Sequence, residues 1–201
     1  QEVHPTIFFG VPRVWEKMQA AIATKLNAAT GTKAILARWA LRTGRDWHSK
    51  ALQGQEPGAW LGLQKRLAGK LVHHKVQRAL GFDQARILLS GAAPIAVENL
   101  QFFTSLDLLI GEVYGQSEDS GPTAISLPGF IRIGAAGKPL PGVQVRIAED
   151  GEILVKGPNV FVGYRSRPEA TAETLQDGWL HTGDLGRIDE DGFIYVTGRK
   201  K

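Results

Sequence analysis

Apolar residues recur at four-residue spacing from position 14 to position 26, and this pattern predicts a helix over 12–28. Pro12 stands near its start, where the missing N–H of proline is tolerated. Similar patterns predict helices over 32–52 and 60–80, with a glycine- and proline-containing break between them. The first 80 residues therefore read as mainly helical.

The predicted helix over 60–80 alternates apolar residues with five Lys and Arg residues and carries no acidic residue. A packed helix with a solvated charged face is the favoured interpretation. Contact of this basic amphipathic helix with an anionic membrane surface is the alternative.

The pattern changes after Gly81. A short apolar run at 86–89 predicts a strand, 95–105 predicts a helix, and 108–113 predicts another strand. This order of elements, with glycine-containing turns between them, is typical of an α/β sheet whose ligand site lies beyond the strand ends.

From residue 137 onward, short apolar runs at 143–147, 152–157, 184–188 and 193–197 are separated by Pro-Gly, Asp-Gly and Gly-Pro turns. They predict a small antiparallel β subdomain. The predicted fold class is therefore α/β: a partial α/β sheet subdomain over 1–136, with a long helical insertion at about 27–80, followed by the β subdomain over 137–201.

Composition excludes several classes of protein. The 201 residues contain no cysteine, so a disulfide scaffold, a thiolate zinc site and a cysteine nucleophile are ruled out. No apolar run approaches the roughly 18 residues of a membrane-spanning helix. These features favour a cytoplasmic protein, with peripheral contact to a membrane as the alternative.

Charge is distributed unevenly along the chain. Residues 1–80 carry 13 Lys and Arg against four Asp and Glu, a net charge of +9, whereas residues 81–201 carry −5. The basic part suits phosphate, an anionic membrane surface or an acidic neighbouring domain. No nucleic-acid-binding motif accompanies the charge, so nucleic acid is not an expected partner.

The run Tyr114-Gly115-Gln116-Ser117-Glu118 offers chemistry suited to a nucleotide. An aromatic ring can stack on a base, a hydroxyl can donate to phosphate, and a carboxylate can hold Mg²⁺ beside phosphates. The alternative is a strand-to-helix turn in which the hydroxyl and the carboxylate only cap the helix.

Two further motifs come near the end of the chain. Asp184, in Thr-Gly-Asp, can accept hydrogen bonds from both hydroxyls of a ribose, although a turn aspartate capping its own backbone is common. Fifteen residues later, Arg199 offers a planar cation to the same sugar or to phosphate.

The order of five motifs decides between these interpretations. They are Ser-Gly-Ala-Ala-Pro at 90–94, Tyr-Gly-x-Ser-Glu at 114–118, Gly-Lys-Pro-Leu-Pro-Gly at 137–142, Gly-Trp-Leu-His-Thr-Gly-Asp at 178–184 and Gly-Arg-Lys-Lys at 198–201. The series resembles the adenylate-forming (acyl-activating) superfamily. Val-Pro-Arg-Val-Trp-Glu-Lys at 11–17 and the helical insertion resemble its AMP-forming long-chain fatty acyl-CoA synthetases.

The resemblance implies roles for individual residues. Residues 91–94 would line the acyl-adenylate pocket and flank the adenine, Tyr114 would stack on that base, and Ser117 would bind the α-phosphate. Glu118 would hold Mg²⁺, Asp184 would bind the ribose hydroxyls with help from Arg199, and Lys201 would lie at the hinge. The implied catalytic residues are Ser117, Glu118 and Lys201, and the implied nucleotide-binding residues are Gly91, Ala92, Ala93, Pro94, Glu112, Val113, Tyr114, Gly115, Ser117, Asp184 and Arg199.

The resemblance further implies a ligase that uses ATP and Mg²⁺ to convert a fatty acid to acyl-AMP, with release of pyrophosphate, and then forms acyl-CoA and AMP with coenzyme A. The chain contains no glycine-rich phosphate loop ending in Pro-Lys and stops at the hinge. It is therefore expected to be an internal piece of a longer enzyme, inactive without the missing N- and C-terminal parts.

Two alternatives remain open from the sequence. One is an adenylate-forming ligase for another acid, whether aryl, medium-chain or amino acid. The other is a non-enzymatic module whose basic helices bind a membrane or a partner protein.

Overall fold

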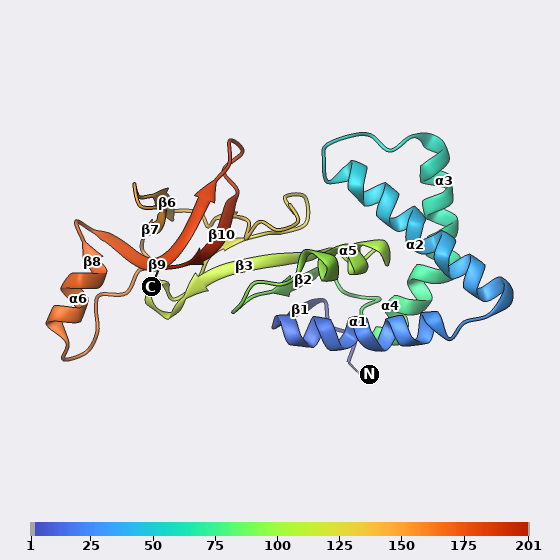
Figure 1. Cartoon of the computed structure of the whole chain (residues 1–201), viewed down its shortest axis with the longest axis horizontal. Coiled ribbons are helices and arrows are strands. Elements are labelled where there is room, and N and C mark those ends of the chain that lie inside the picture. Colours follow the sequence, from blue (N-terminus) through green and yellow to red (C-terminus); the bar gives the residue numbers. More distant parts are fainter. Residues whose placement is uncertain (1–2, 201) are drawn as a thin grey trace. The chain divides into compact units, whose positions relative to one another are not determined.

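A computed structural model describes residues 3–200 of the chain. The chain forms two compact units, residues 1–110 and 111–201 (Figure 1). A compact unit need not be an independently folding domain. The division into domains at 136–137 therefore stays a prediction.

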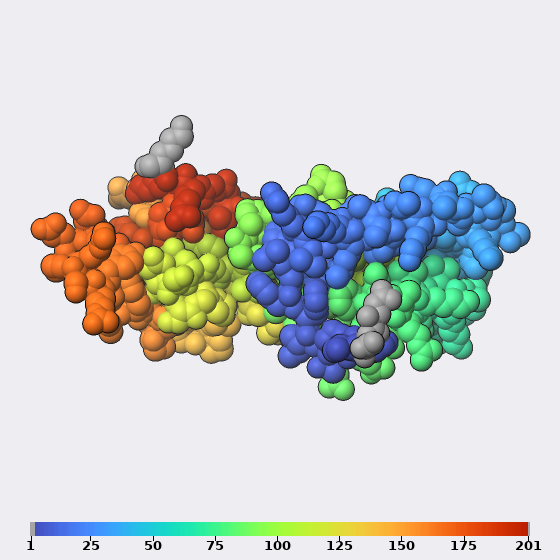
Figure 2. All heavy atoms as spheres, turned by 90° about the horizontal axis from the view of Figure 1, so that it is seen from below, coloured from blue at the N-terminus to red at the C-terminus, as the bar shows by residue number. Residues whose placement is uncertain are grey.

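The first unit contains a pair of parallel strands. β1 (Ile7–Gly10) runs beside β2 (Ile87–Ser90), with Ile7 opposite Ile87. A parallel pair needs a long crossover connection, and helices between the two strands supply it here. The space-filling view shows the blue atoms of the chain's beginning against green atoms of this same unit (Figure 2).

Within the described residues 3–110, five α-helices and one π-helical turn complete the first unit. In chain order they are α1 (Pro12–Asn27), α2 (Gly31–Ala51), α3 (Ala59–Ala68), the π-helical turn η1 (Gly69–His73), α4 (His74–Leu80) and α5 (Val97–Ser105). The helices expected over 12–28 and 32–52 are confirmed. The third helix, expected over 60–80, is observed as α3 and α4 with the π-helical turn η1 between them. The apolar pattern does not indicate this turn. None of the helices described within residues 3–200 is long and apolar enough to cross a bilayer.

An aromatic cluster forms the centre of this unit. The Trp15 ring is fully buried and lies 5.3 Å from the rings of both Phe8 and Phe103 and 5.8 Å from that of Phe82. Its indole N–H donates to the carbonyl of Gly10 at 3.1 Å, which satisfies its polar atom inside the core. The cluster joins β1, α1 and α5.

A charged contact fastens the helical segment to the end of α5. Asp107 accepts a hydrogen bond from His48 of α2 at 2.7 Å and pairs with Lys65 of α3 at 2.6 Å. Burial opposes the charge of Asp107, but these two partners outweigh it and hold its pKa at about 2. Gln77 of α4 donates to the carbonyl groups of Leu106 and Asp107.

The second unit is built from antiparallel strands in two groups. In the first, β3 (Ile110–Gln116) pairs with β4 (Gly121–Ile125), which pairs with β5 (Lys138–Pro139). In the second, β10 (Ile194–Arg199), β9 (Trp179–Ile188), β7 (Glu152–Lys156) and β6 (Gln144–Ile147) lie in that order. The short strand β8 (Leu175–Gln176) also pairs with β9, and α6 (Pro168–Thr174) precedes it.

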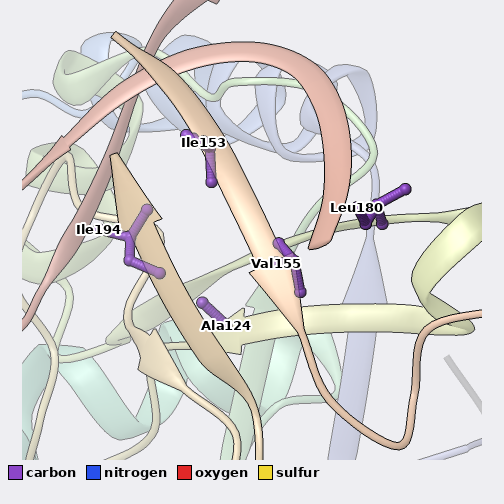
Figure 3. Close-up of a cluster of buried hydrophobic side chains, with 5 residues drawn as sticks. All are labelled: Ala124, Ile153, Val155, Leu180 and Ile194. Carbon is purple, nitrogen blue, oxygen red and sulfur yellow. The ribbon is translucent and has the colours of Figure 1, made fainter. Parts of the chain in front are cut away.

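A hydrophobic cluster holds the second unit together. Ile153 and Val155 of β7, Leu180 of β9, Ile194 of β10 and Ala124 of β4 are fully buried (Figure 3). The two β7 residues are separated by one position, as expected of side chains on one face of a strand. The cluster joins both groups of strands into one core.

Most of the predicted strands are confirmed, with one informative shift. The strand expected over 184–188 begins at Trp179, so Asp184 lies within a strand rather than at its start. The additional length pairs with β7 and β8, which a pattern within one segment cannot reveal. β1, β4, β5, β8 and α6 were not expected from the sequence. The fold class is nevertheless confirmed: α/β, with a parallel strand pair and a small antiparallel β region.

Candidate active site

Three of the expected residues meet in the second unit. The Tyr114 hydroxyl donates to Oδ2 of Asp184 at 3.0 Å, and Nε of Arg199 lies 3.8 Å from Oδ1 of the same carboxylate. They come from β3, β9 and β10, and Arg199 is the register partner of Asp184. The Asp184 side chain is largely buried, whereas that of Arg199 is 76% exposed. We call this group the Tyr114–Asp184–Arg199 cluster.

The electrostatics of the cluster fix which atoms can donate. Burial and the adjacent Asp184 carboxylate raise the pKa of the Tyr114 hydroxyl above its ordinary value, so this group stays protonated and donates. Asp184 can accept further hydrogen bonds through its two oxygens. A partly buried carboxylate beside an exposed guanidinium and a half-buried aromatic ring can therefore contact a polyhydroxylated ligand.

The segment of β9 that carries Asp184, where the pairing with β7 is irregular, is held by several contacts. Gly183 has a φ of 72°, a left-handed conformation that favours glycine. The Thr182 hydroxyl donates to the carbonyl of Ile153 at 2.7 Å and accepts from the Asp184 N–H at 3.1 Å. Gly183 thus supplies the backbone conformation required before Asp184, and Thr182 ties the Asp184 backbone to β7.

The expected phosphate segment forms the end of β3 and a short 3₁₀ turn, η2 (Ser117–Asp119). Ser117 is exposed, and Glu118 accepts a hydrogen bond at 2.7 Å from the hydroxyl of Tyr164. Capping of the turn is done by Gln116 and Asp119, each bonding to the backbone of the other. Because those two residues cap the turn, Ser117 and Glu118 are not needed for that role.

Gly115 has a packing function. A Cβ at this position would collide with the carbonyl oxygen of Gly121 in β4, so no larger residue fits. The close approach is therefore between two strands. Approach of a ligand to this glycine stays a prediction.

Glu112 and Val113 lie in β3, ahead of Tyr114. One oxygen of Glu112 accepts the N–H of Gly134 at 3.1 Å, and burial raises the pKa of this carboxyl to about 7. Val113 is half-buried and opposite Ile125 of β4. Glu112 can thus change its charge near neutral pH.

The expected adenine-flanking residues lie in the first unit, directly after β2. Gly91 is buried, and Ala92, Ala93 and Pro94 are exposed. Ala92 has a φ of 69°, uncommon for a residue other than glycine. The buried Ser90 hydroxyl has no hydrogen-bond partner among the residues described. Lys201, the expected hinge residue, lies outside those residues.

A hollow of about 320 Å³ lies in the second unit. Its walls include Glu118, Tyr164, His181, Gly183 and Arg199, together with Glu152. Across residues 3–200, no three His, Cys, Asp or Glu side chains gather into a metal-binding group. A cation bound in this hollow would therefore be coordinated by oxygens of a bound ligand as well as by oxygens of the protein.

Sequence reasoning missed Glu152 and Tyr164. Glu152 follows an Asp-Gly turn and opens a strand, a position where a carboxylate is ordinarily solvated. Tyr164 lies 46 residues from its partner Glu118. No local pattern connects either residue to the cluster.

The sequence matches the family described as "AMP-binding enzyme" over residues 1–165. The chain belongs to this family. The match includes residues 91–94 and 112–118, whereas Asp184 and Arg199 lie beyond it.

Curated relatives match essentially the whole chain. The long-chain-fatty-acid–CoA ligase ACSBG2 of Xenopus laevis is 43% identical over 100% of the chain and 28% of its own length. The putative fatty-acid–CoA ligase fadD11 of Mycobacterium tuberculosis is 44% identical over 100% of the chain and 35% of its own length. The chain thus spans about a third of the length of these relatives.

A solved structure similar to this chain is that of o-succinylbenzoate coenzyme A synthetase (MenE) from Bacillus subtilis, in complex with ATP and magnesium ion. It is 35% identical, with a TM-score of 0.54, over 58% of this chain and 27% of the synthetase. The matched part of the chain therefore shares its fold with this synthetase.

Proposed function

We propose that this chain forms the nucleotide-binding part of an AMP-forming long-chain fatty acid–CoA ligase. The observation that carries the proposal is the Tyr114–Asp184–Arg199 cluster, in which three sequence-distant residues meet around one carboxylate. The names of the curated relatives support the choice of acid.

The cluster suits the nucleoside of ATP or AMP. Tyr114 offers a ring face for the adenine, and Asp184 accepts from the ribose hydroxyls, with Arg199 beside it. Ser117, exposed at η2, donates to the α-phosphate. Glu112, Val113 and the backbone at Gly115 lie along the same strand, and residues 91–94 have the adenine-flanking role that the resemblance implies.

Magnesium fits the donor set at η2. Glu118 and Ser117 provide hard oxygen donors, and Mg²⁺ is commonly held by one or two carboxylates together with substrate phosphates. When bound, the ion supplies neutralisation of phosphate charge. The Glu118 carboxylate is held in place for this ion, because one of its oxygens accepts a hydrogen bond from the Tyr164 hydroxyl at 2.7 Å.

The chemistry proceeds in two displacements. A fatty carboxylate oxygen attacks the α-phosphorus of ATP, forming acyl-AMP while the bond to pyrophosphate breaks. The thiolate of coenzyme A then attacks the acyl carbon, forming the thioester while AMP leaves. The residues of this chain contribute by positioning the nucleotide and by donating to its phosphate.

The test is calorimetric titration of the chain with a non-hydrolysable long-chain acyl-adenylate mimic and Mg²⁺. We expect saturable binding that weakens by about 10–100-fold in Asp184→Ala, because two hydrogen bonds to a charged group are lost. Glu190→Ala, which removes an exposed carboxylate elsewhere in the second unit, is the matched control. Equal binding by the parent and Asp184→Ala would contradict the proposal.

The same titration addresses the choice of acid. Mimics carrying an aryl, a medium-chain or an aminoacyl group are compared with the long-chain mimic. Tighter binding of the long-chain mimic supports a fatty acid ligase. Tighter binding of another mimic would leave the proposed adenylate-forming chemistry in place and would indicate a different acid as substrate.

An anionic membrane surface is a second candidate ligand, favoured by a specific observation. Four exposed apolar residues recur along α3 and η1, and the stretch from 57 to 82 contains no acidic residue. We call this the basic apolar face; it comprises Trp60, Leu63, Arg66, Leu67, Lys70 and Leu71. Such a face suits anionic lipid headgroups, because Trp and Leu enter the interface while the cations remain at its surface.

Sedimentation with vesicles of anionic and zwitterionic lipid tests this candidate. We expect salt-sensitive binding to the anionic vesicles that falls at least about tenfold when Arg66→Glu and Lys70→Glu are combined. The combination of Lys33→Glu and Lys50→Glu on α2 changes net charge equally and serves as control. Equal loss of vesicle binding in both double variants would show that only net charge matters, and would contradict a role for this face.

A further inference from the structure

Glu152 is a buried carboxylate for which the proposed chemistry has no role. It opens β7 and is 4% exposed. One oxygen, Oε1, accepts the N–H of Gly183 at 2.8 Å. The other, Oε2, accepts from Nδ1 of His181 at 3.0 Å and from Nζ of Lys200 at 2.9 Å. Three donors thus converge on a single side chain.

Two of these donors lie next to the Asp184–Arg199 pair in sequence and in space. Gly183 immediately precedes Asp184, and Lys200 immediately follows Arg199. The backbone N–H of Lys200 also donates to the carbonyl of Gly183 at 2.7 Å. Glu152 therefore contacts Gly183 and Lys200, which face each other next to the Asp184–Arg199 pair, on one side of it.

The charge of Glu152 is maintained by the same contacts. Burial opposes ionisation, but the hydrogen bonds from Lys200, Gly183 and His181 outweigh it, so the pKa of Glu152 lies below its ordinary value. As a carboxylate the group is acceptor-only, which matches three donors. An amide in its place would present an N–H₂ group to part of this donor set.

We propose that Glu152 is a positioning residue for the ribose site: it fixes Gly183 of β9 and Lys200, so that Asp184 meets the 2′ and 3′ hydroxyls of a nucleotide. This inference rests on the proposed nucleotide-binding function. Glu152 acts through Gly183 and Asp184 and does not itself touch the sugar.

The test compares AMP with 2′,3′-dideoxy-AMP in calorimetric titrations of the full chain. The parent is expected to bind AMP about 10–100-fold more tightly, because only AMP can donate to Asp184. In Glu152→Gln we expect this preference to fall about tenfold, with the affinity for the dideoxy nucleotide unchanged within about twofold. If Glu152 had a merely structural role, Glu152→Gln would lower the affinity for both nucleotides equally.

Two further variants separate positioning from folding. Asp150→Asn removes the other carboxylate that pairs with Lys200, at 2.5 Å, and should keep the ribose preference. Lys200→Met removes a 44% exposed side chain, a change that the fold should tolerate, and should lower the preference about 2–5-fold. If Glu152→Gln fails to fold, Lys200→Met still gives a result.

The outcomes separate this inference from the proposed function. An unchanged preference in both Glu152→Gln and Lys200→Met, or equal weakening of both nucleotides, overturns the positioning role while the nucleotide site stands. Absence of AMP binding by the folded parent overturns the proposed function and this inference together. Loss of preference confined to the Glu152 and Lys200 variants supports the positioning role.

Discussion

Two glutamates of the second unit differ in their chemistry because their partners differ. Glu112 accepts one backbone N–H, from Gly134, and burial dominates its ionisation. Glu152 accepts from a backbone N–H, a histidine and a lysine, and these contacts outweigh burial. At the scale of the residue, the number and charge of the donors decide whether a buried carboxyl favours or resists ionisation.

Glu112→Gln should make stability less dependent on pH. The pKa of Glu112 rises from 4.5 to about 7 on folding, so its contribution is fully present below about 4.5 and is lost as pH rises through 7. Glutamine stays neutral and keeps an oxygen for the Gly134 N–H. We expect the variant to be about 1–2 kcal/mol more stable than the parent at pH 8 and nearly equal at pH 5.

Urea unfolding at the two pH values measures this difference. The control is Glu149→Gln, which changes an exposed glutamate of the same unit. A difference at pH 8 no larger than that of the control would show that ionised Glu112 carries no penalty in the folded protein.

At the scale of the element, the packing of α2 depends on one glycine. A Cβ at Gly44 would collide with the carbonyl oxygen of Ser105, at the end of α5, and would lie 2.9 Å from its carbonyl carbon. The Cε1 atom of His73 would be 3.3 Å away. The absence of a side chain at Gly44 therefore permits the contact between α2 and α5.

Gly44→Ala should destabilise the first unit by about 2 kcal/mol, since a backbone carbonyl cannot move as readily as a side chain. Gly62→Ala in α3 is the matched control, because its Cβ would make an ordinary 3.5 Å contact with the Trp47 ring. Alanine is the better helix former, so this control should gain up to about 1 kcal/mol. Denaturant unfolding followed by circular dichroism measures both, and equal effects would contradict the close packing of α2.

At the scale of the whole molecule, the two compact units differ in composition and in proposed role. Residues 1–80, within the first unit, carry a net charge of +9 and the basic apolar face. The second unit contains the Tyr114–Asp184–Arg199 cluster and the hollow beside it. Ligand effects should therefore differ between the units.

Hydrogen exchange of the intact chain tests this division. A ligand that binds only the folded protein slows exchange most where its contacts prevent local opening. With ATP and Mg²⁺, peptides covering 112–119 and 179–186 should exchange more slowly, and those covering α2 and α3 should be unaffected. Asp184→Ala should abolish the protection. Protection confined to α2 and α3 would contradict nucleotide binding in the second unit.

Features that depend on neighbours along the chain could be predicted from the amino-acid sequence. Helix periodicity located α1 and α2, turn residues separated the strands of the second unit, and the ordered motifs identified the nucleotide-binding superfamily. These signals are local, because side chains three or four positions apart share a helix face and turn residues act on their own backbone.

Which distant groups meet depends on the folded arrangement of the strands. Tyr114 reaches Asp184 across 70 positions, and Glu152 gathers donors from 31 and 48 positions away. Such contacts depend on strand pairing and register, which place β3, β7, β9 and β10 in one unit. A pattern read along one segment contains no information about register with another. The motifs could therefore indicate the candidate ligand residues but could not indicate Glu152, whose position is determined by folding of the strands around it.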